Sequence, residues 1–504
     1  MPKASFDSLP EDILVVILSK SNPVSVRRCH QVNRILRKII STDHYLQYLL
    51  ELESCGYVEP CCPRSDLSYT EKAQILRNHK LQWDDPTKIV PAHHKLPDYN
   101  RQSVKLAKGT CTWRVQISME WALFQLPSIN RGTELKTWSI NPGTMGLTAA
   151  IEPDQDLIAI LDDCGTIHLL SATTGQHHPK AAVTPIMCLG EELKTIHMNS
   201  SARLELVDSH LVGVFCQKTS MFYTMIIWNW STGCELVRHV IEGNDHIFFR
   251  TFDFLSEDIF VICRQFDSTH GGLQPSQKRA LGLLDVYQFD PLADAPSAAK
   301  LLVSLELPPH QPNATPHNSY IFFSSSLYAS QSCRAQIWDI SPDDRTLCIT
   351  FRSFQSGDYA SNLLVPSYVL QELAYNNKGA AVAWDNWSFK ACWEESSGTH
   401  LSWNDSVEGY GRRLAIMRYR PSLTFTTTIN FYHFREGLTG SPKTFGCKPS
   451  TVEIGPGAVR HPAKGFTPNL YWMNMNDENT DMLSGKRVLT DSDAACIQKS
   501  TINP

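Results

Sequence analysis

Side chains that could do chemistry occur in this chain as a few small groups. Two adjacent histidines stand at His177-His178 and two adjacent cysteines at Cys61-Cys62, while acidic pairs occur at Asp162-Asp163 and Asp343-Asp344. A metal site needs three or four ligands at suitable spacing, and neither the histidine pair nor the cysteine pair has such partners. We therefore expect these residues to lie in polar turns, and we expect no bound metal and no cofactor.

Sequence motifs of known enzyme classes are absent as well. The chain has no Gly-x-Ser-x-Gly nucleophile turn, no Walker phosphate loop, no His-Glu-x-x-His pair and no Gly-x-Gly-x-x-Gly after a predicted strand. The sequence therefore predicts a protein that is not an enzyme, and its function has to be sought in binding.

Composition describes an ordinary globular chain that is long enough for more than one domain. It has 504 residues, 42% hydrophobic and 19% charged, with a net charge of −5. That charge is too small to attract nucleic acid or an anionic membrane. Fifteen cysteines without a Cys-x-x-Cys pair do not indicate a disulfide framework. With no apolar segment near Met1, we expect a cytoplasmic or nuclear protein.

The stretch from Phe6 to Ile40 carries the clearest structural signals. Pro10 fits the first position of a helix, and Ser21-Asn22-Pro23 ends that helix and offers Asn22 as the cap of a second one. A third helix should carry Val32 to Ile40 with aliphatic residues on one face, followed by a fourth from about His44. Forty residues cannot bury this much aliphatic surface in a core of their own, so a partner should cover part of it.

This stretch resembles an F-box. The resemblance rests on Leu9 to Leu14 (Leu-Pro-Glu-Asp-Ile-Leu), on Ile17-Leu18, on Val32-Asn33-Arg34 and on Arg37 followed by Ile39. Members of that family dock these helices onto the Skp-type adaptor of cullin-based ubiquitin ligases. The resemblance covers about 40 residues, and it implies that the chain is the substrate-recognition subunit of an SCF-type E3 ligase.

The same resemblance indicates which side chains would meet the adaptor. They are the aliphatic and proline residues of the first and third predicted helices: Leu9, Pro10, Ile13, Leu14, Ile17, Leu18, Val32, Leu36 and Ile39. The expected partners are the Skp-type adaptor, through it a cullin, and a protein substrate whose identity the sequence does not reveal. No nucleic acid and no membrane are expected.

Two other interpretations of these helices stay open. They could be an internal cap on a larger domain that binds no partner. Alternatively, Lys20 to Lys38 holds six Lys or Arg and no acid, which could suit the recognition face of a helix-turn-helix. Against the second, Cys29, Ile35 and Leu36 help to give the third helix a broad apolar face.

Gly56 is a natural terminator of the fourth helix. Ser68 and Glu71 then have the spacing of a capping box, which predicts a linker helix that runs to about Trp83.

From about Cys111 the hydrophobic period changes from 3.6 to 2. We predict a large all-β region with almost nothing helical.

A sequence repeat in this β region indicates its architecture. A hydrophobic strand followed by a polar turn recurs at intervals of 40 to 60 residues, which is typical of β-propeller blades. An assortment of β-sandwiches is the alternative. The repeated strands are Thr166–Leu170, Met225–Trp230, Leu284–Phe289, Ala335–Ile340 and Ile429–Phe434, with Ala381–Asp385 as a further concealed one and a first blade around Trp113 to Gly132. Trp338-Asp339 also resembles the Trp-Asp signature of WD-type blades, so we expect a degenerate WD-like propeller of about seven blades.

The predicted organisation is thus α+β and multidomain. Residues 1–54 form the F-box module, residues 55–108 a linker helix and connecting segment, and residues 109–504 a propeller closed by C-terminal strands near 487–497. The alternative function is a β-propeller scaffold, or a propeller-type enzyme, whose helices are only a cap and which has no role in ubiquitin transfer.

Overall fold

The computed structural model describes most of the helical region and the strands of the β region. The described residues are 9–84, 91–95, 105–115, 119–182, 186–187, 202–216, 223–241, 252–265, 282–293, 296–308, 319–323, 334–340, 345–353, 359–395, 406–410, 413–420, 426–435, 446–454, 469–476, 488–491 and 494–501.

Five helices form the first part of the chain, and local sequence signals set their ends. They are α1 (Glu11–Ser19), α2 (Pro23–Val32), α3 (Arg34–Thr42), α4 (His44–Cys55) and α5 (Tyr69–Asp84). Asn22 caps α2 and Asp43 caps α4, each accepting a backbone N–H hydrogen bond at 2.8 Å. Ser68 and Glu71 form the capping box of α5. These helix starts confirm the predictions from residue type.

The boundary between the second and third helices differs from the prediction. Val32 is the last residue of α2 and not part of α3, because Asn33 adopts an extended backbone conformation and breaks the helix. The Asn33 side chain then caps α3 by accepting hydrogen bonds from the N–H groups of Ile35 and Leu36. Val32 therefore points from a different helix than Leu36 and Ile39.

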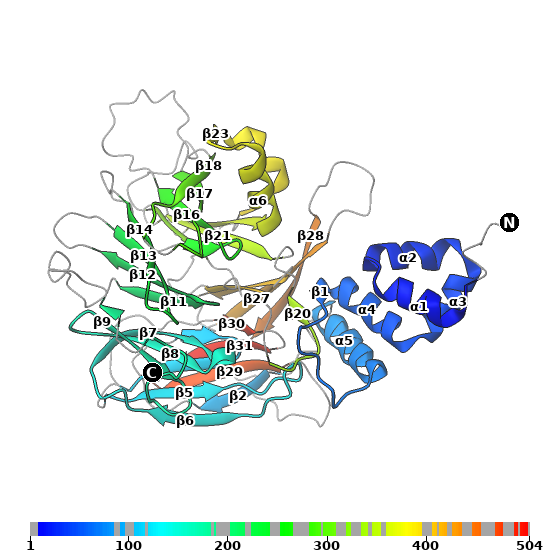
Figure 1. Ribbon diagram of the computed structural model, residues 1–504, viewed down its shortest axis with the longest axis horizontal. Helices are drawn as coiled ribbons and strands as arrows, with labels where there is room; N and C mark the ends of the chain where they lie inside the picture. The colour runs from blue at the N-terminus through cyan, green and yellow to red at the C-terminus, as the bar shows by residue number, and fades with distance from the viewer. Residues whose placement is uncertain are drawn as a thin grey trace.

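The helices share one apolar core. Its buried members include Leu14, Leu18, Val26, Leu36, Ile39, Ile40, Leu46, Tyr48, Leu49, Leu52, Tyr57 and Leu76. Burying each large side chain contributes about 1.5–3 kcal/mol. In Figure 1, α1, α2 and α3 project away from the β region, and α4 and α5 lie closer to it. We call the unit formed by α1 to α4 the helical module. None of the helices in the described part of the chain combines the length and apolar character needed to cross a bilayer.

Strands in the described residues of the β region form seven sheets of four or five strands, as expected for a propeller of about seven blades. The first sheet contains β3 (Lys105–Ala107), β4 (Thr110–Arg114), β5 (Trp121–Gln125) and β6 (Lys136–Ile140), and the second contains β7 (Gly146–Glu152), β8 (Leu157–Asp162), β9 (Thr166–Ser171) and β10 (Ile186–Met187). The third contains β11 (Arg203–Val207), β12 (His210–Cys216), β13 (Tyr223–Asn229) and β14 (Glu235–Ile241). The fourth contains β15 (Phe252–Phe254), β16 (Ile259–Gln265), β17 (Gly282–Gln288) and β18 (Lys300–Glu306), to which β23 (Ala380–Val382) adds a fifth strand.

The other three sheets complete the set. They are β19 (Ser319–Phe323), β21 (Thr346–Ser353), β22 (Tyr359–Pro366) and β24 (Cys392–Glu395); β25 (Ser406–Tyr410), β26 (Arg413–Arg420), β27 (Thr426–Arg435) and β28 (Gly446–Ile454); and β2 (Pro91–Lys95), β29 (Asn469–Asn476), β31 (Ala494–Thr501) and β30 (Val488–Asp491). Neighbouring sheets lie side by side, with β7 contacting both β3 and β11, β25 contacting β21, and β30 contacting β25. This succession of four- and five-stranded sheets, most of whose strand pairs are antiparallel, is a β-propeller.

Four of the five repeated segments occupy the same place in their sheets. They form β9, β13, β17 and β27, each the third strand of its sheet. The prediction is wrong for Ala335–Ile340, of which only Asp339–Ile340 is a strand, β20, paired with β1 (Tyr57–Val58) outside the blades. It is also wrong for Ala381–Asp385, because Ala380–Val382 joins β18 as a parallel fifth strand.

One helix interrupts the β region, where almost nothing helical was predicted. Helix α6 (Ser367–Asn376) follows β22 directly and buries Val369, Leu370 and Leu373 against β18 and β22. At the C-terminal end, β30 and β31 pair as a hairpin, and β31 lies in the same sheet as β2 from the linker. The last sheet thus contains a strand from the connecting segment that precedes the predicted β region.

A buried histidine predicts how the stability of the propeller varies with pH. His210 is buried between Phe254 and Phe289, and neither ring nitrogen has a hydrogen-bond partner among the described residues. Burial lowers its pKa below the ordinary 6.5, although Asp208 opposes the shift. The unfolded chain therefore binds the proton first as pH falls. Stability should decrease as pH drops below about 6.5, and denaturant titrations across that range should show a smaller decrease for His210→Leu.

Candidate partner-binding site

An exposed apolar stripe runs along α1. Pro10, Ile13, Val16 and Ile17 follow helical spacing, so they share one side of the helix. Ile13 is 47% exposed, Val16 57% and Ile17 38%. Leu14 and Leu18 adjoin this stripe on the helix and point into the core of the module. Helix α1 thus carries a broad apolar surface, of which the chain buries only one part.

A second group of exposed aliphatic residues lies on α2 and at the start of α3. Val24 and Ile35 are exposed, and Val32 is 83% exposed at the end of α2. Single exposed apolar residues are common in soluble proteins. Here, however, the three exposed aliphatic side chains of α2 and α3 and the stripe on α1 leave this small module with apolar surface that its own core does not bury.

The nine residues predicted to meet an adaptor divide into two sets. Leu14, Leu18, Leu36 and Ile39 are buried inside the helical module and support the surface from beneath. The remainder reach the surface: Leu9 is half-buried, and Pro10, Ile13, Ile17 and Val32 are exposed.

Val16, Val24 and Ile35 are exposed apolar residues that the predicted set omitted. The F-box resemblance points to the positions of a motif, and these positions include residues of its core. Which side of a helix is exposed depends on where the other helices pack against it. The sequence alone did not specify that packing.

Positive charge lies beside these apolar residues at the end of α1 and on α2 and α3, whereas Glu11 and Asp12 are exposed at the start of α1. Lys20, Arg28, Arg34 and Lys38 are exposed and form no ion pair with any residue that the structure describes. Arg27 pairs with Glu53, and the Arg37 guanidinium donates to backbone carbonyl groups of its own module. The rim of the exposed apolar surface is therefore basic on the side of α2 and α3 and acidic at the start of α1.

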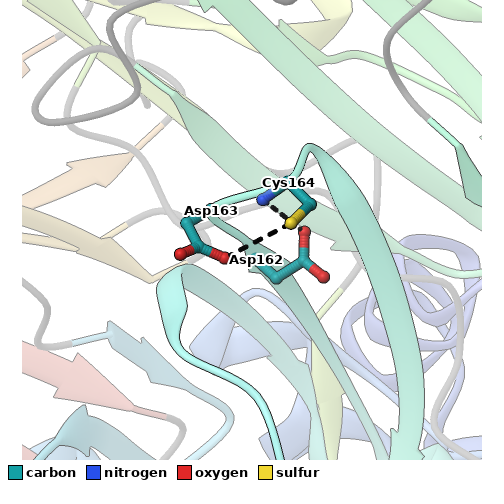
Figure 2. Close-up of side chains that lie close together, drawn as sticks. All are labelled: Asp162, Asp163 and Cys164. Atoms are coloured by element: carbon teal, nitrogen blue, oxygen red, sulfur yellow. Dashed lines mark hydrogen bonds between the residues drawn. The ribbon is translucent and has the colours of Figure 1, made fainter.

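The acidic residues of the β8–β9 turn act as turn residues, as expected. Asp162, Asp163 and Cys164 lie close together there (Figure 2). One carboxylate oxygen of Asp162 accepts hydrogen bonds from the N–H groups of Cys164 at 3.0 Å and Thr166 at 2.7 Å. The other lies 2.8 Å from Nε2 of His168. The Asp162 carboxylate therefore stabilises the turn through these contacts.

The adjacent histidines differ from the expectation in one respect. His177 is exposed, but His178 is buried, so the prediction of a polar turn is wrong for His178. Its Nε2 lies 3.0 Å from the carbonyl oxygen of Gln155, and its ring packs edge-on against Trp230 at 5.3 Å. His178 is thus a core histidine. Cys61 and Cys62 are both exposed, and Asp343-Asp344 lies outside the described residues.

Comparison with known proteins identifies one domain. The F-box domain family matches residues 6–48, which include α1, α2 and α3. A comparison with curated proteins found no match.

Solved structures similar to this chain include a β-propeller domain and a set of WD40 repeats. The β-propeller domain of Cps50 (Swd1) from Myceliophteria thermophila is 10% identical, with 62% of this chain and 73% of that chain covered and a TM-score of 0.31. The WD40 repeats of RRP9 are also 10% identical, with 63% and 87% covered and a TM-score of 0.29. The dihydro-heme d1 dehydrogenase NirN is 11% identical, with 70% and 69% covered and a TM-score of 0.25.

The propeller assignment rests on the chain's own seven sheets, and the assignment of the helical module rests on the family match together with its exposed apolar face. Residues 6–48 are an F-box domain, and they precede a β-propeller in this chain.

Proposed function

We propose that this protein is the substrate-recognition subunit of a cullin-type ubiquitin ligase. The F-box domain binds the Skp-type adaptor, the adaptor connects the chain to a cullin, and the propeller binds a protein target. The observation that supports this most directly is the α1 stripe, because Ile13, Val16 and Ile17 stay exposed while the core of their module is already filled.

Burial of this stripe would supply the binding energy. Each exposed aliphatic side chain that a partner removes from water contributes about 25 cal/mol per Å² of apolar area. Side chains near the centre of such a contact usually dominate its affinity. Ile13 and Ile17 occupy that place on α1, whereas Leu14 and Leu18 hold the helix on the module.

In this function the chain makes and breaks no covalent bond. Its contribution is to hold a target lysine near a conjugating enzyme that carries ubiquitin, which turns a rare encounter into an intramolecular one. The propeller supplies the target-binding surface, and loops between its strands are where recognition residues are usually found.

The test is a pull-down of the purified chain with a Skp-type adaptor. We expect the wild-type protein to bind, and the triple variant Leu9→Ala, Pro10→Ala, Ile17→Asp to lose binding. A matched triple on exposed apolar residues of the propeller, Leu135→Ala, Met145→Ala, Leu292→Asp, should bind like wild type. Failure of the wild-type chain to bind, or full binding by the first triple, would refute the proposal.

A further inference from the structure

The segment from Arg334 to Ile340, which we call the clasp, reaches out of the propeller into the helical region. It lies in the chain between β19 and β21, two strands of one propeller sheet. Its Ile337 and Trp338 nevertheless belong to the core formed by the helices. In Figure 1 the β20 strand of the clasp and β1 lie where the helices meet the β region. A stretch from the middle of the propeller therefore completes the core beneath the F-box domain.

Trp338 is the main apolar anchor of the clasp. Its ring is buried and stacks on Tyr57, with ring centres 5.4 Å apart and planes 9° from parallel. The ring of His79 from α5 packs against it at 5.0 Å. The Tyr57 hydroxyl and Nε2 of His79 are 2.8 Å apart, so these two rings are also held to each other.

Hydrogen bonds fasten the clasp to the helical region along its length. The Tyr48 hydroxyl of α4 donates to the carbonyl oxygen of Ile337. The Gln336 N–H donates to the carbonyl oxygen of Cys62 at 3.0 Å, and the Arg64 N–H donates to the carbonyl oxygen of Gln336 at 3.0 Å. Pairing of β20 with β1 continues this ladder.

The propeller holds the same segment from the other side. Buried Asn130, in the loop between β5 and β6, accepts hydrogen bonds through Oδ1 from the N–H groups of Ile337 at 2.8 Å and Trp338 at 2.9 Å, and its Nδ2 donates to the Trp338 carbonyl oxygen at 3.1 Å. Arg334 donates to the carbonyl oxygen of Pro153 and pairs with Asp154 at 3.6 Å. The clasp is thus hydrogen-bonded to segments beside two propeller sheets and to helix α4, and it packs against the ring of His79 on α5.

A separate contact joins the linker to the propeller beside the clasp. The Arg64 guanidinium donates to the carbonyl oxygen of Ile129 at 2.8 Å and pairs with Asp66. Gly132 leaves the room for it, since a Cβ at that position would come within 2.8 Å of the guanidinium carbon. Arg64 therefore ties the start of the linker to the same loop that holds the clasp.

We propose that the clasp fixes the orientation of the F-box domain relative to the propeller, with Trp338 and Asn130 as its positioning residues. Domains joined by a linker move relative to each other unless a substantial interface holds them. The consequence for ubiquitin transfer rests on the proposed function: a fixed angle gives the adaptor-bound enzyme access to a limited set of lysines on the propeller side. The orientation itself does not depend on that function.

Single-molecule energy transfer between two dyes tests the orientation. The dyes are attached to non-natural amino acids at Gln31 and Leu292, both exposed, because Cys61, Cys62, Cys164 and Cys234 are exposed and would react with thiol labels. We expect one narrow distance distribution for the parent protein and a distribution about twice as wide or wider for Trp338→Ala. Trp338→Phe, which keeps a flat ring against Tyr57, should restore the narrow distribution.

Trp387→Ala is the matched control for general destabilisation. Trp387 is buried in the propeller core away from the clasp, so its removal should lower stability and leave the distance distribution narrow. An unchanged distribution for Trp338→Ala would overturn the proposal. A broadening for Trp387→Ala equal to that of Trp338→Ala would overturn it too, because the effect would then be one of stability.

An assay with the reconstituted ligase tests the consequence of the clasp for ubiquitin transfer separately from adaptor binding. Trp338→Ala should bind the Skp-type adaptor as wild type does, while self-ubiquitination mapped by mass spectrometry spreads over more lysines of the propeller. The same lysine pattern in both proteins would refute the role in ubiquitin transfer. Absence of adaptor binding by the wild-type chain would refute the proposed function alone, because the dye distances would still report whether the clasp fixes the orientation.

Discussion

Ile13→Asp combined with Ile17→Asp should weaken binding of the Skp-type adaptor by about 1,000-fold or more, because two central side chains of a contact are each worth about 2 kcal/mol or more. Both isoleucines are exposed on the same side of α1. Each new carboxylate would have to lose its water against an apolar partner surface without gaining a partner of its own. Titration calorimetry with the purified adaptor measures the change.

Two controls separate contact residues from core residues. Leu292→Asp places the same charge on a propeller leucine that is 86% exposed, and it should leave the affinity unchanged. Leu14→Ala removes a buried side chain of the F-box domain and should cost about 2–5 kcal/mol of stability, seen as a lower melting temperature. If the double aspartate variant kept its affinity within a factor of a few, α1 would not be the contact surface.

Arg345→Met should destabilise the propeller by about 3–5 kcal/mol, the usual cost of leaving one member of a buried ion pair alone. Arg345 is 3% exposed and Asp253 2% exposed, and Nη1 of Arg345 lies 3.1 Å from the Asp253 carboxylate. The same guanidinium donates to the carbonyl oxygen of Phe254. This pair connects the residue before β21 with β15, so it joins two neighbouring sheets. Urea unfolding followed by tryptophan fluorescence gives the change.

The double variant Arg345→Met, Asp253→Leu tests the cause. If the cost comes from an unpaired buried charge, removing both charges should recover much of the lost stability. Arg238→Ala, which breaks the exposed pair with Glu235, should change stability by about 1 kcal/mol or less. A cost for Arg345→Met as small as that of Arg238→Ala would show that the buried pair does not hold these sheets together.

Local signals made the helical part of the fold predictable. Caps at Asn22, Asp43 and Ser68 act within three or four residues, so residue type and spacing suffice to place them. The same locality explains the error at Val32. The residues around Val32 are compatible with one continuous helix and also with two helices, and the cap that Asn33 forms on α3 produces the second arrangement.

Tertiary contacts decided what the sequence left undetermined. Trp338-Asp339 has the local pattern of a blade strand, yet Trp338 is buried against Tyr57 and His79, which lie more than 250 positions earlier in the chain. Four of the five propeller repeats were predictable because each is a short apolar strand followed by a polar turn, a pattern that is visible within a few residues. The exposed part of the F-box surface was only partly predictable, since the residues of a family motif include both its core and its surface.

The strand β2 has a consequence for synthesis on the ribosome. Pro91 of β2 pairs with Leu470 of β29 in a parallel register, so the final sheet cannot assemble before the chain has grown through residue 470. At about 5–20 residues per second this takes roughly 20 to 75 s after β2 is made. During that interval β2 presents an open strand edge that invites aggregation and chaperone binding.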